Sequence, residues 1–200
     1  MRLFVVRHGE TESNAARVFQ LPATPLSARG RRQAERLAAR VAPLGVAAIL
    51  TSDLARAAET AAAIAARTGA PISLEPMLRE RDFGDIRGTP YDALGRDPFA
   101  LDYQPPNGES WPLFRARVAS AWEAVARFAT AATGNVVVVT HGLVCRALVE
   151  QHLALPPDTA PPALWGNTAL TEVDPTPPWT VRLLACTAHL DDDGTPRGIA

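Results

Sequence analysis

Two short apolar runs each lead into a His-Gly pair, and these junctions limit the possible folds more than any other feature of the chain. The segment LFVVRHG places His8 after the first run, and NVVVVTHG places His141 after the second. Uninterrupted apolar runs of this length are typical of strands buried on both faces of a parallel sheet. Ligands of such sheets bind beyond the carboxyl ends of the strands. We therefore expect both histidines to point into one shared site.

Strand and helix patterns alternate along the rest of the chain, which predicts an α/β fold. We expect strands at residues 3–6, 46–50, 72–74, 136–139, 168–173 and 180–184. The spacing of apolar side chains predicts helices at residues 27–41, 53–67, 110–129 and 141–153, with a short helix at 91–94. These elements predict a three-layer α/β/α sandwich with a mostly parallel central sheet. A chain of 200 residues suits one buried core, so residues 1–200 are expected to form a single domain.

Residues 76–112 interrupt this alternation. The segment is rich in turn-forming residues, carries charges of both signs and contains Gly84, Gly88, Gly95 and Gly108. A stretch this long with little regular structure usually carries function rather than linking domains. We expect it to form a loop or lid beside the active site.

Charge and composition exclude several classes of protein. A net charge of −1 gives no basic excess to attract nucleic acid or a membrane surface, and no apolar run approaches the ~18 residues of a membrane span. The first apolar run is too short for a signal peptide, and Cys145 and Cys186 form no CxxC motif. We therefore expect a cytoplasmic protein with free thiols that acts on a small molecule. The sequence leaves open whether it forms a homodimer.

Five motifs are spread along the chain from residue 5 to residue 142. They are VVRHGETESN from Val5, TSDLARAAETA from Thr51, LRERDFGDIRG from Leu78, NGESWPLFRARV from Asn107 and VVVVTHG from Val136. In this order they resemble the histidine phosphatase superfamily, specifically its phosphoglycerate-mutase-like branch. The resemblance implies the phosphoglycerate-mutase-like form of the α/β/α fold and catalysis through a phosphorylated histidine.

The chemistry of phosphate transfer suggests roles for several residues of these motifs. It needs a nucleophile, cations for the phosphoryl oxygens and an acid for the leaving oxygen. A neutral imidazole can be the nucleophile, which fits His8, and guanidinium groups suit phosphoryl oxygens, which fits Arg7 and Arg56. Taken alone, Arg56 could equally be a solvated helix residue. His141 would be a cationic or hydrogen-bonding partner, aided by amides at the start of the next helix. Gly9 would leave room for a phosphate.

The acid is not decided by chemistry alone, because Glu80, Asp82 and Asp85 share one loop. The resemblance places the proton donor at the Glu of L-R-E, which is Glu80. It also implies that Asn14 and Gly142 bind substrate. A second branch of the superfamily carries an acid directly after its second histidine, and Gly142 at that position argues against that branch.

Two departures from the family pattern concern the substrate. Leu21 follows Gln20 where a Gly is common, and Ile86 and Arg87 stand where Trp-Glu is common before Gly88. Both border the expected substrate mouth, where Arg87 could bind a second acidic group or face water. The natural substrate stays open among α-ribazole phosphate, a sugar phosphate, a phosphoglycerate derivative and a broad set.

We therefore predict a metal-independent phosphomonoesterase that hydrolyses a small phosphorylated metabolite through a phosphohistidine intermediate, without a cofactor. The alternative is a cofactor-dependent phosphoglycerate mutase, an isomerase that would use the same residues; mutases of this family are generally longer. A non-catalytic phosphate-binding module would most simply have lost His8, His141 or Glu80. His152 shares a helix face with Cys145, Leu148 and Val149 and is expected to pack there, and His189 is also expected to be structural. No cluster of His, Cys and carboxylates has metal-ligand spacing.

Overall fold

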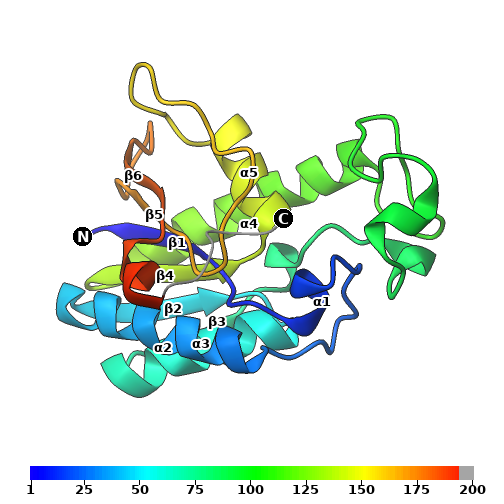
Figure 1. The fold of residues 1–200 in the computed structure, drawn as a ribbon. Coiled ribbons are helices and arrows are strands. Elements are labelled where there is room, and N and C mark those ends of the chain that lie inside the picture. The colour runs from blue at the N-terminus through cyan, green and yellow to red at the C-terminus, as the bar shows by residue number, and fades with distance from the viewer. Residues whose placement is uncertain (194–200) are drawn as a thin grey trace.

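A six-stranded sheet lies at the centre of the computed structural model, which describes residues 1–193 (Figure 1). In sheet order the strands are β3 (Ile72–Leu74), β2 (Val46–Thr51), β4 (Asn135–Thr140), β1 (Leu3–Arg7), β5 (Leu170–Val173) and β6 (Val181–Cys186). The first four run parallel to one another, whereas β5 and β6 are antiparallel to their neighbours. The expected mostly parallel sheet is confirmed.

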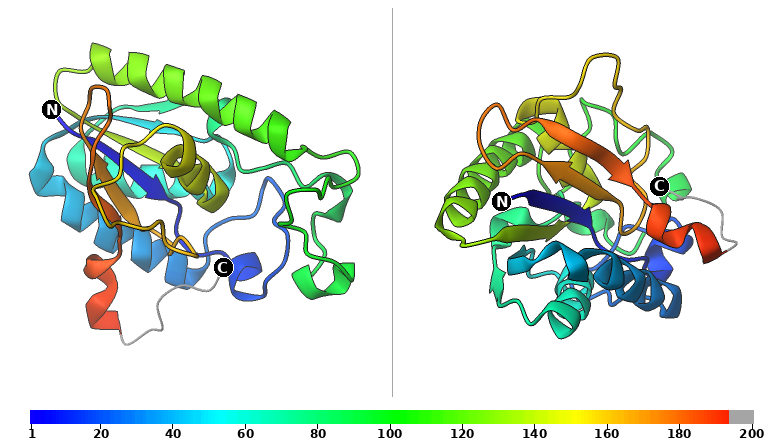
Figure 2. Two further views of the ribbon diagram at one scale, coloured as in Figure 1. Left: turned by 90° about the horizontal axis from the view of Figure 1, so that it is seen from above. Right: turned by 90° about the vertical axis from the view of Figure 1, so that its left-hand side faces the viewer.

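Helices cover both faces of this sheet (Figure 2). They are α1 (Glu12–Ala15), α2 (Ala28–Val41), α3 (Ala55–Thr68), α4 (Trp111–Ala131) and α5 (Gly142–Gln151). Successive side chains of a strand point to opposite faces. In β1, Phe4 and Val6 accordingly pack with the apolar residues of α2 and α3, whereas Leu3 and Val5 pack with those of α4 and α5. The three-layer α/β/α sandwich is confirmed.

Several element ends follow the expected signals. The Ser27 hydroxyl accepts a hydrogen bond from the Gly30 N–H and caps α2, and Ser110 caps α4 in the same way. Gly69 ends α3 in the left-handed conformation, with a φ of 73°. The expected strand at 168–173 begins two residues late, because Thr168 has a φ of 55°, which no regular strand accommodates.

The short helix α1 was not expected. It begins with a capping box in which the Thr11 side chain accepts from the Asn14 N–H, and the Asn14 side chain accepts from the Thr11 N–H. The T-x-x-N spacing carried this signal. These two hydrogen bonds form shortly after the His8-Gly9 pair that follows β1. They fix the side chain of Asn14, which is 3% exposed.

The segment 76–112 contains short 3₁₀ helices at Pro76–Leu78, Gly84–Ile86 and Tyr91–Leu94 joined by turns. Others lie at Ala42–Leu44 and Ala188–Asp193. Aromatic side chains of the segment pack with Phe19 from the loop after α1, forming a small buried cluster separate from the two main cores. The segment therefore lies beside α1, as the green chain at the right of Figure 1 shows. Among the described residues, no helix is long and apolar enough to cross a membrane.

Candidate active site

The two His-Gly junctions meet at one edge of the sheet. β1 and β4 are parallel neighbours, and the His8 N–H donates a hydrogen bond to the Thr140 carbonyl at 2.9 Å. The rings of His8 and His141 consequently lie 5.1 Å apart, measured between centroids. β2 flanks β4 on the other side, which brings Ser52 to the same edge. Three strand ends therefore supply one site.

The imidazole of His8 is held in one orientation and one tautomer. Its Nδ1 lies 2.6 Å from the Gly9 carbonyl oxygen, which can only accept, so Nδ1 carries the hydrogen and Nε2 keeps its lone pair. Burial and the positive charges of Arg56 and Arg7 lower the pKa of His8 well below its usual value. His8 is therefore neutral at pH 7, with an unprotonated nitrogen able to act as a nucleophile.

Two buried arginines flank this imidazole. Arg7 donates to the Trp165 carbonyl, and Arg56 donates to the Leu21 carbonyl at 3.3 Å. Burial lowers the pKa of Arg56 to about 10, which leaves it charged at neutral pH. Each of these arginines also has a buried Nε without a hydrogen-bond partner within the described part of the chain. Both cations can therefore bind an anion next to His8.

His141 is the second histidine of the site, and its ring lies beside that of His8. Its Nε2 is 2.9 Å from the Ser52 hydroxyl oxygen, while its buried Nδ1 has no partner among the residues that the structure describes. Burial, Arg56 and the other histidine lower the pKa of His141 well below its usual value. Sequence reasoning assigned no role to Ser52, although its place in TSDLAR directly after a strand was a usable signal.

Of the three acidic residues in the loop, Glu80 is the one that reaches the start of α5. Its Oε1 accepts from the Arg81 N–H at 2.9 Å, and its Oε2 accepts from the Leu143 N–H at 3.1 Å. Burial raises the pKa of Glu80, although these hydrogen bonds and the charges of Arg56 and Arg7 oppose the shift. The amides at the start of α5 were expected to bind an anion. In the structure the Leu143 amide binds the carboxylate of Glu80.

The other two carboxylates have different partners. Asp82 accepts from Arg87 at 2.5 Å and from the Gly84 N–H at 2.7 Å. Asp85 accepts from the Asn107 side chain at 2.8 Å on the surface. Arg87, whose side chain is 32% exposed, thus forms an ion pair with Asp82 at the edge of the site. Its binding of a second acidic group stays a prediction.

Asn14 and Gly142 both line the cavity around His8. The Asn14 oxygen accepts from the Thr11 N–H and from the Asn167 side chain, each at 3.3 Å. A β-carbon at Gly9 would lie 2.5 Å from the Gly30 carbonyl oxygen, so the close approach of α2 requires a glycine there. The room that Gly9 would leave for a phosphate stays a prediction.

The cavity has a volume of about 1070 Å³, which is large for a small-molecule site. Apolar and aromatic side chains form much of its wall, including Phe19, Phe83, Tyr91 and Phe99. Its charged lining is mainly basic and consists of Arg7, Arg17, Arg56, Arg79, Arg81, Arg87, Arg117 and Arg146, with Asp53, Glu80, Asp82, Asp97 and Glu109. The excess of arginine suits an anionic ligand.

The remaining histidines lie elsewhere. The His152 ring stacks on Trp122 with centroids 6.4 Å apart, and His189 contacts Arg40 and the Thr168 hydroxyl, each at 3.0 Å. No group of three or more His, Cys, Asp and Glu residues within residues 1–193 has the geometry to hold a metal ion.

A neutral histidine at a strand end, beside two buried arginines and a second histidine, is the arrangement that the sequence motifs predicted. A family model described as the histidine phosphatase superfamily, branch 1, matches residues 3–186. The chain belongs to this superfamily. The match confirms the resemblance and the branch, and with the structural relatives it confirms that the chain is a histidine phosphatase enzyme.

Relatives of this chain within the superfamily are named for different activities. The "Probable phosphoglycerate mutase GpmB" of Yersinia enterocolitica is 32% identical over 96% of this chain and 95% of its own length. The crystal structure of the α-ribazole phosphatase from Shigella flexneri is 27% identical, with a TM-score of 0.79 over 94% of this chain and 98% of that one. A mycobacterial glucosyl-3-phosphoglycerate phosphatase in complex with VO3 is 29% identical, with a TM-score of 0.73 over 86% of this chain and 90% of that one.

These relatives bear on the expectation that chain length separates phosphatase from mutase. This chain matches 95% of the length of the relative named as a probable mutase. Chain length therefore does not distinguish a phosphatase from a mutase here.

Proposed function

We propose that this histidine phosphatase hydrolyses a small phosphomonoester through a phosphohistidine formed on His8. One observation carries the proposal. Three buried nitrogens without partners in the described structure, Arg7 Nε, Arg56 Nε and His141 Nδ1, surround a neutral imidazole. Unpaired buried nitrogens of this kind are costly unless a ligand supplies acceptors, and the oxygens of a phosphoryl group would do so.

The first step forms a bond from His8 Nε2 to phosphorus and breaks the bond from phosphorus to the leaving oxygen. The two arginines and His141 stabilise the charge on the equatorial oxygens, where the removal of one such donor typically costs ~10²–10³-fold. Glu80 donates its proton to the leaving alkoxide. Its raised pKa keeps part of the carboxyl protonated above the usual range, which favours this role.

The second step reverses the proton transfer. A water molecule attacks the phosphorus of the phosphohistidine, and the Glu80 carboxylate accepts a proton from that water. The nitrogen–phosphorus bond then breaks, which returns neutral His8 and releases inorganic phosphate. Each step uses only groups of this chain and water, so the proposed reaction involves no metal ion and no cofactor.

The substrate is a phosphomonoester small enough to enter the cavity whole. A volume of about 1070 Å³ admits a leaving group of sugar size or larger. The relatives' names point to α-ribazole phosphate, glucosyl-3-phosphoglycerate and phosphoglycerate as compounds to test. The cofactor-dependent mutase stays as the alternative, because an isomerase would use the same five catalytic residues. A non-catalytic phosphate-binding module is disfavoured, since His8, His141 and Glu80 are all present.

The deciding experiment compares hydrolysis with isomerisation. Purified protein is incubated with p-nitrophenyl phosphate in EDTA, and with 3-phosphoglycerate in the presence and absence of 2,3-bisphosphoglycerate. We expect hydrolysis of the first compound, and phosphate release from the second that exceeds its conversion to 2-phosphoglycerate. Interconversion that outruns phosphate release would assign the mutase activity instead. Loss of hydrolysis in EDTA, restored by a divalent ion, would overturn the metal-independent mechanism.

A further inference from the structure

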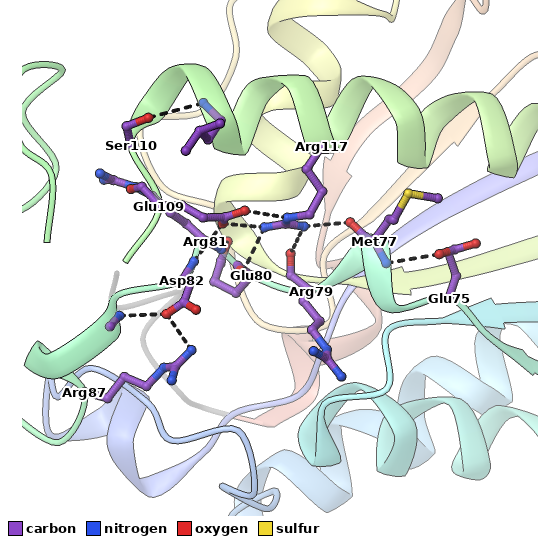
Figure 3. Close-up of polar contacts among 12 residues, drawn as sticks. Glu75, Met77, Arg79, Glu80, Arg81, Asp82, Arg87, Glu109, Ser110 and Arg117 are labelled. Atoms are coloured by element: carbon purple, nitrogen blue, oxygen red, sulfur yellow. Dashed lines mark hydrogen bonds and ion pairs between the residues drawn. The ribbon is translucent and has the colours of Figure 1, made fainter. Parts of the chain in front are cut away.

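Glu80 lies in a segment without regular secondary structure, so something other than a sheet or helix must hold it in place. Figure 3 shows an arginine from α4 at the centre of the contacts around this segment. Arg117 donates through Nη1 to the carbonyl oxygens of Met77 at 2.7 Å and Arg79 at 2.8 Å. Through Nη2 it donates to the carbonyl oxygen of Glu80 at 3.2 Å.

The rest of the Arg117 guanidinium binds Glu109. Nε and Nη2 each lie 2.7 Å from one of the Glu109 carboxylate oxygens, which is the bidentate geometry of a strong ion pair. A guanidinium has five N–H groups, and these five contacts use all of them. Arg117 is therefore fully committed to the segment and to Glu109, and has no donor left for a substrate.

Glu109 in turn fixes the chain on the far side of Glu80. Its carboxylate accepts from the Asp82 N–H at 2.9 Å, and its own N–H donates to the Asp82 carbonyl at 2.9 Å. The next residue after Glu80, Arg81, donates to the Glu109 carbonyl at 3.0 Å and to the Tyr103 carbonyl at 2.6 Å. The chain is thus held immediately before, at and after Glu80.

The proposed mechanism assigns no other role to the hydrogen bonds of Arg117 and Glu109. Arg117 and Glu109 line the cavity, but the proposed mechanism gives neither of them a role, and the five hydrogen bonds of Arg117 include none to His8. Burial raises the pKa of Glu109, but the hydrogen bonds from Arg117 and Asp82 and the charges of Arg117 and Arg81 outweigh it. The net shift is downward, so the ionised form of Glu109, which binds Arg117, is favoured.

We propose that Arg117 and Glu109 are positioning residues that hold the Glu80 carboxyl against the leaving oxygen. The proposal rests on the proposed function, in which Glu80 is the acid. A misplacement of about 1 Å can cost on the order of 10²-fold in rate. A loosened segment should therefore weaken proton donation without changing the phosphate cradle, which consists of Arg7, His8, Arg56 and His141.

The test uses leaving groups that differ in their need for an acid. Arg117→Lys keeps the positive charge but cannot make five directed contacts. We expect it to slow hydrolysis of an alkyl or sugar phosphate by about 10- to 100-fold and that of p-nitrophenyl phosphate by less than about threefold. Glu109→Gln, which loses the ion pair but keeps one acceptor oxygen, should show the same preference with a smaller loss.

A double variant separates positioning from general destabilisation. If Arg117 acts through Glu80, Arg117→Lys should cost nothing further on the alkyl ester once Glu80→Gln is present. Arg115→Lys is the matched control, because Arg115 lies on the same helix, contacts Glu150 and makes no hydrogen bond to residues 77–82. Equal losses on both esters that multiply with those of Glu80→Gln would overturn the proposal.

A titration provides a readout that does not need activity. The carboxyl of Glu80 can be followed by ¹³C NMR in glutamate-labelled protein, with its signal assigned by its absence in Glu80→Gln. The charged or titratable groups that act on it are Arg7, Arg56, Arg81, Tyr91 and Cys145. None of them changes in the variants.

We expect the raised pKa of Glu80 to move toward its ordinary value in Arg117→Lys, because the released carboxyl gains access to water. An unchanged pKa together with an unchanged leaving-group preference would show that Arg117 does not position Glu80. A wild-type protein that hydrolyses neither ester would contradict the proposed function, while the titration would still decide the positioning.

Discussion

The phosphate cradle and the segment that carries Glu80 are held in place by different means. His8 and His141 follow buried parallel strands, and their backbone is fixed by ladder hydrogen bonds such as that from the His8 N–H to Thr140. Glu80 lies between turns. Its backbone is held by Arg117 from α4, and the backbone of Asp82 is held by Glu109, which precedes this helix. One half of the site is positioned by the sheet, the other by arginine and glutamate side chains.

This difference between the two halves of the site indicates which changes should affect all substrates and which should depend on the substrate. A cradle built on the sheet binds the phosphoryl group that every substrate shares, so changes in it should affect all substrates alike. The segment 76–112 carries Glu80, the proposed acid for the leaving group, so changes there should depend on the substrate. The variants below test that division, from the largest expected effect to the smallest.

His8→Ala should remove activity on every ester, by about 10⁴-fold or more, because it deletes the nucleophile. Rapid quenching with labelled substrate should trap an acid-labile, base-stable phosphate on the wild-type protein and none on the variant. His152→Ala, which alters a histidine stacked on Trp122, should trap as much label as the wild type. Label at the wild-type level on His8→Ala would show that the nucleophile is another residue.

Glu80→Gln should slow hydrolysis of an alkyl or sugar phosphate by ~10²–10⁴-fold, because these leaving groups need a proton. The effect on p-nitrophenyl phosphate should be much smaller, since nitrophenolate leaves without one. Asp85→Asn is the control, because its side chain bonds to Asn107 on the surface. If Asp82→Asn showed the leaving-group dependence and Glu80→Gln did not, the acid would be Asp82.

The pH dependence follows from the same group. The proton donor is present below the pKa of Glu80 and is lost as the pH rises through it. Since burial raises that pKa, the wild-type rate on an alkyl ester should decline at a pH above the ordinary range of a glutamate. Glu80→Gln should remove this decline from the pH profile of kcat.

Arg56→Lys should slow the alkyl ester and p-nitrophenyl phosphate to similar extents, by ~10²–10³-fold. The variant keeps the positive charge, but lysine lacks the planar guanidinium that can donate to two phosphoryl oxygens at once. Arg67→Lys, at an exposed position in the last turn of the same helix, serves as the control. A loss confined to one class of ester would contradict the division between cradle and segment.

Arg87→Ala should have the smallest effect. Arg87 is partly exposed and paired with Asp82, and pairs of this kind contribute little to binding or stability. We expect kcat on p-nitrophenyl phosphate to change by less than about twofold, and KM to rise by less than about tenfold for substrates that carry a second acidic group. An effect as large as that of Arg56→Lys would place Arg87 in the cradle.

The sequence alone placed His8 and His141, because the end of a buried strand is a local feature of the chain. A run of four apolar residues between turn signals is typical of a buried strand, and the residues that follow it then lie at the strand end. Since two such runs lie in parallel in one sheet, His8 and His141 were bound to meet. The helices α2, α3 and α4 could be predicted for a similar reason, because Ser27, Gly69 and Ser110 mark their ends through local hydrogen bonds and backbone angles.

Only the tertiary structure decided what surrounds Glu80. Its contacts with Leu143 and Arg117 join residues 63 and 37 positions apart in the chain, and no periodicity encodes such pairs. The same holds for Gly9, whose reason lies in the carbonyl of Gly30 on a helix that approaches from another layer. A pattern in the sequence reports what the backbone does nearby, whereas the partner of a buried charge depends on which distant elements the fold brings against it.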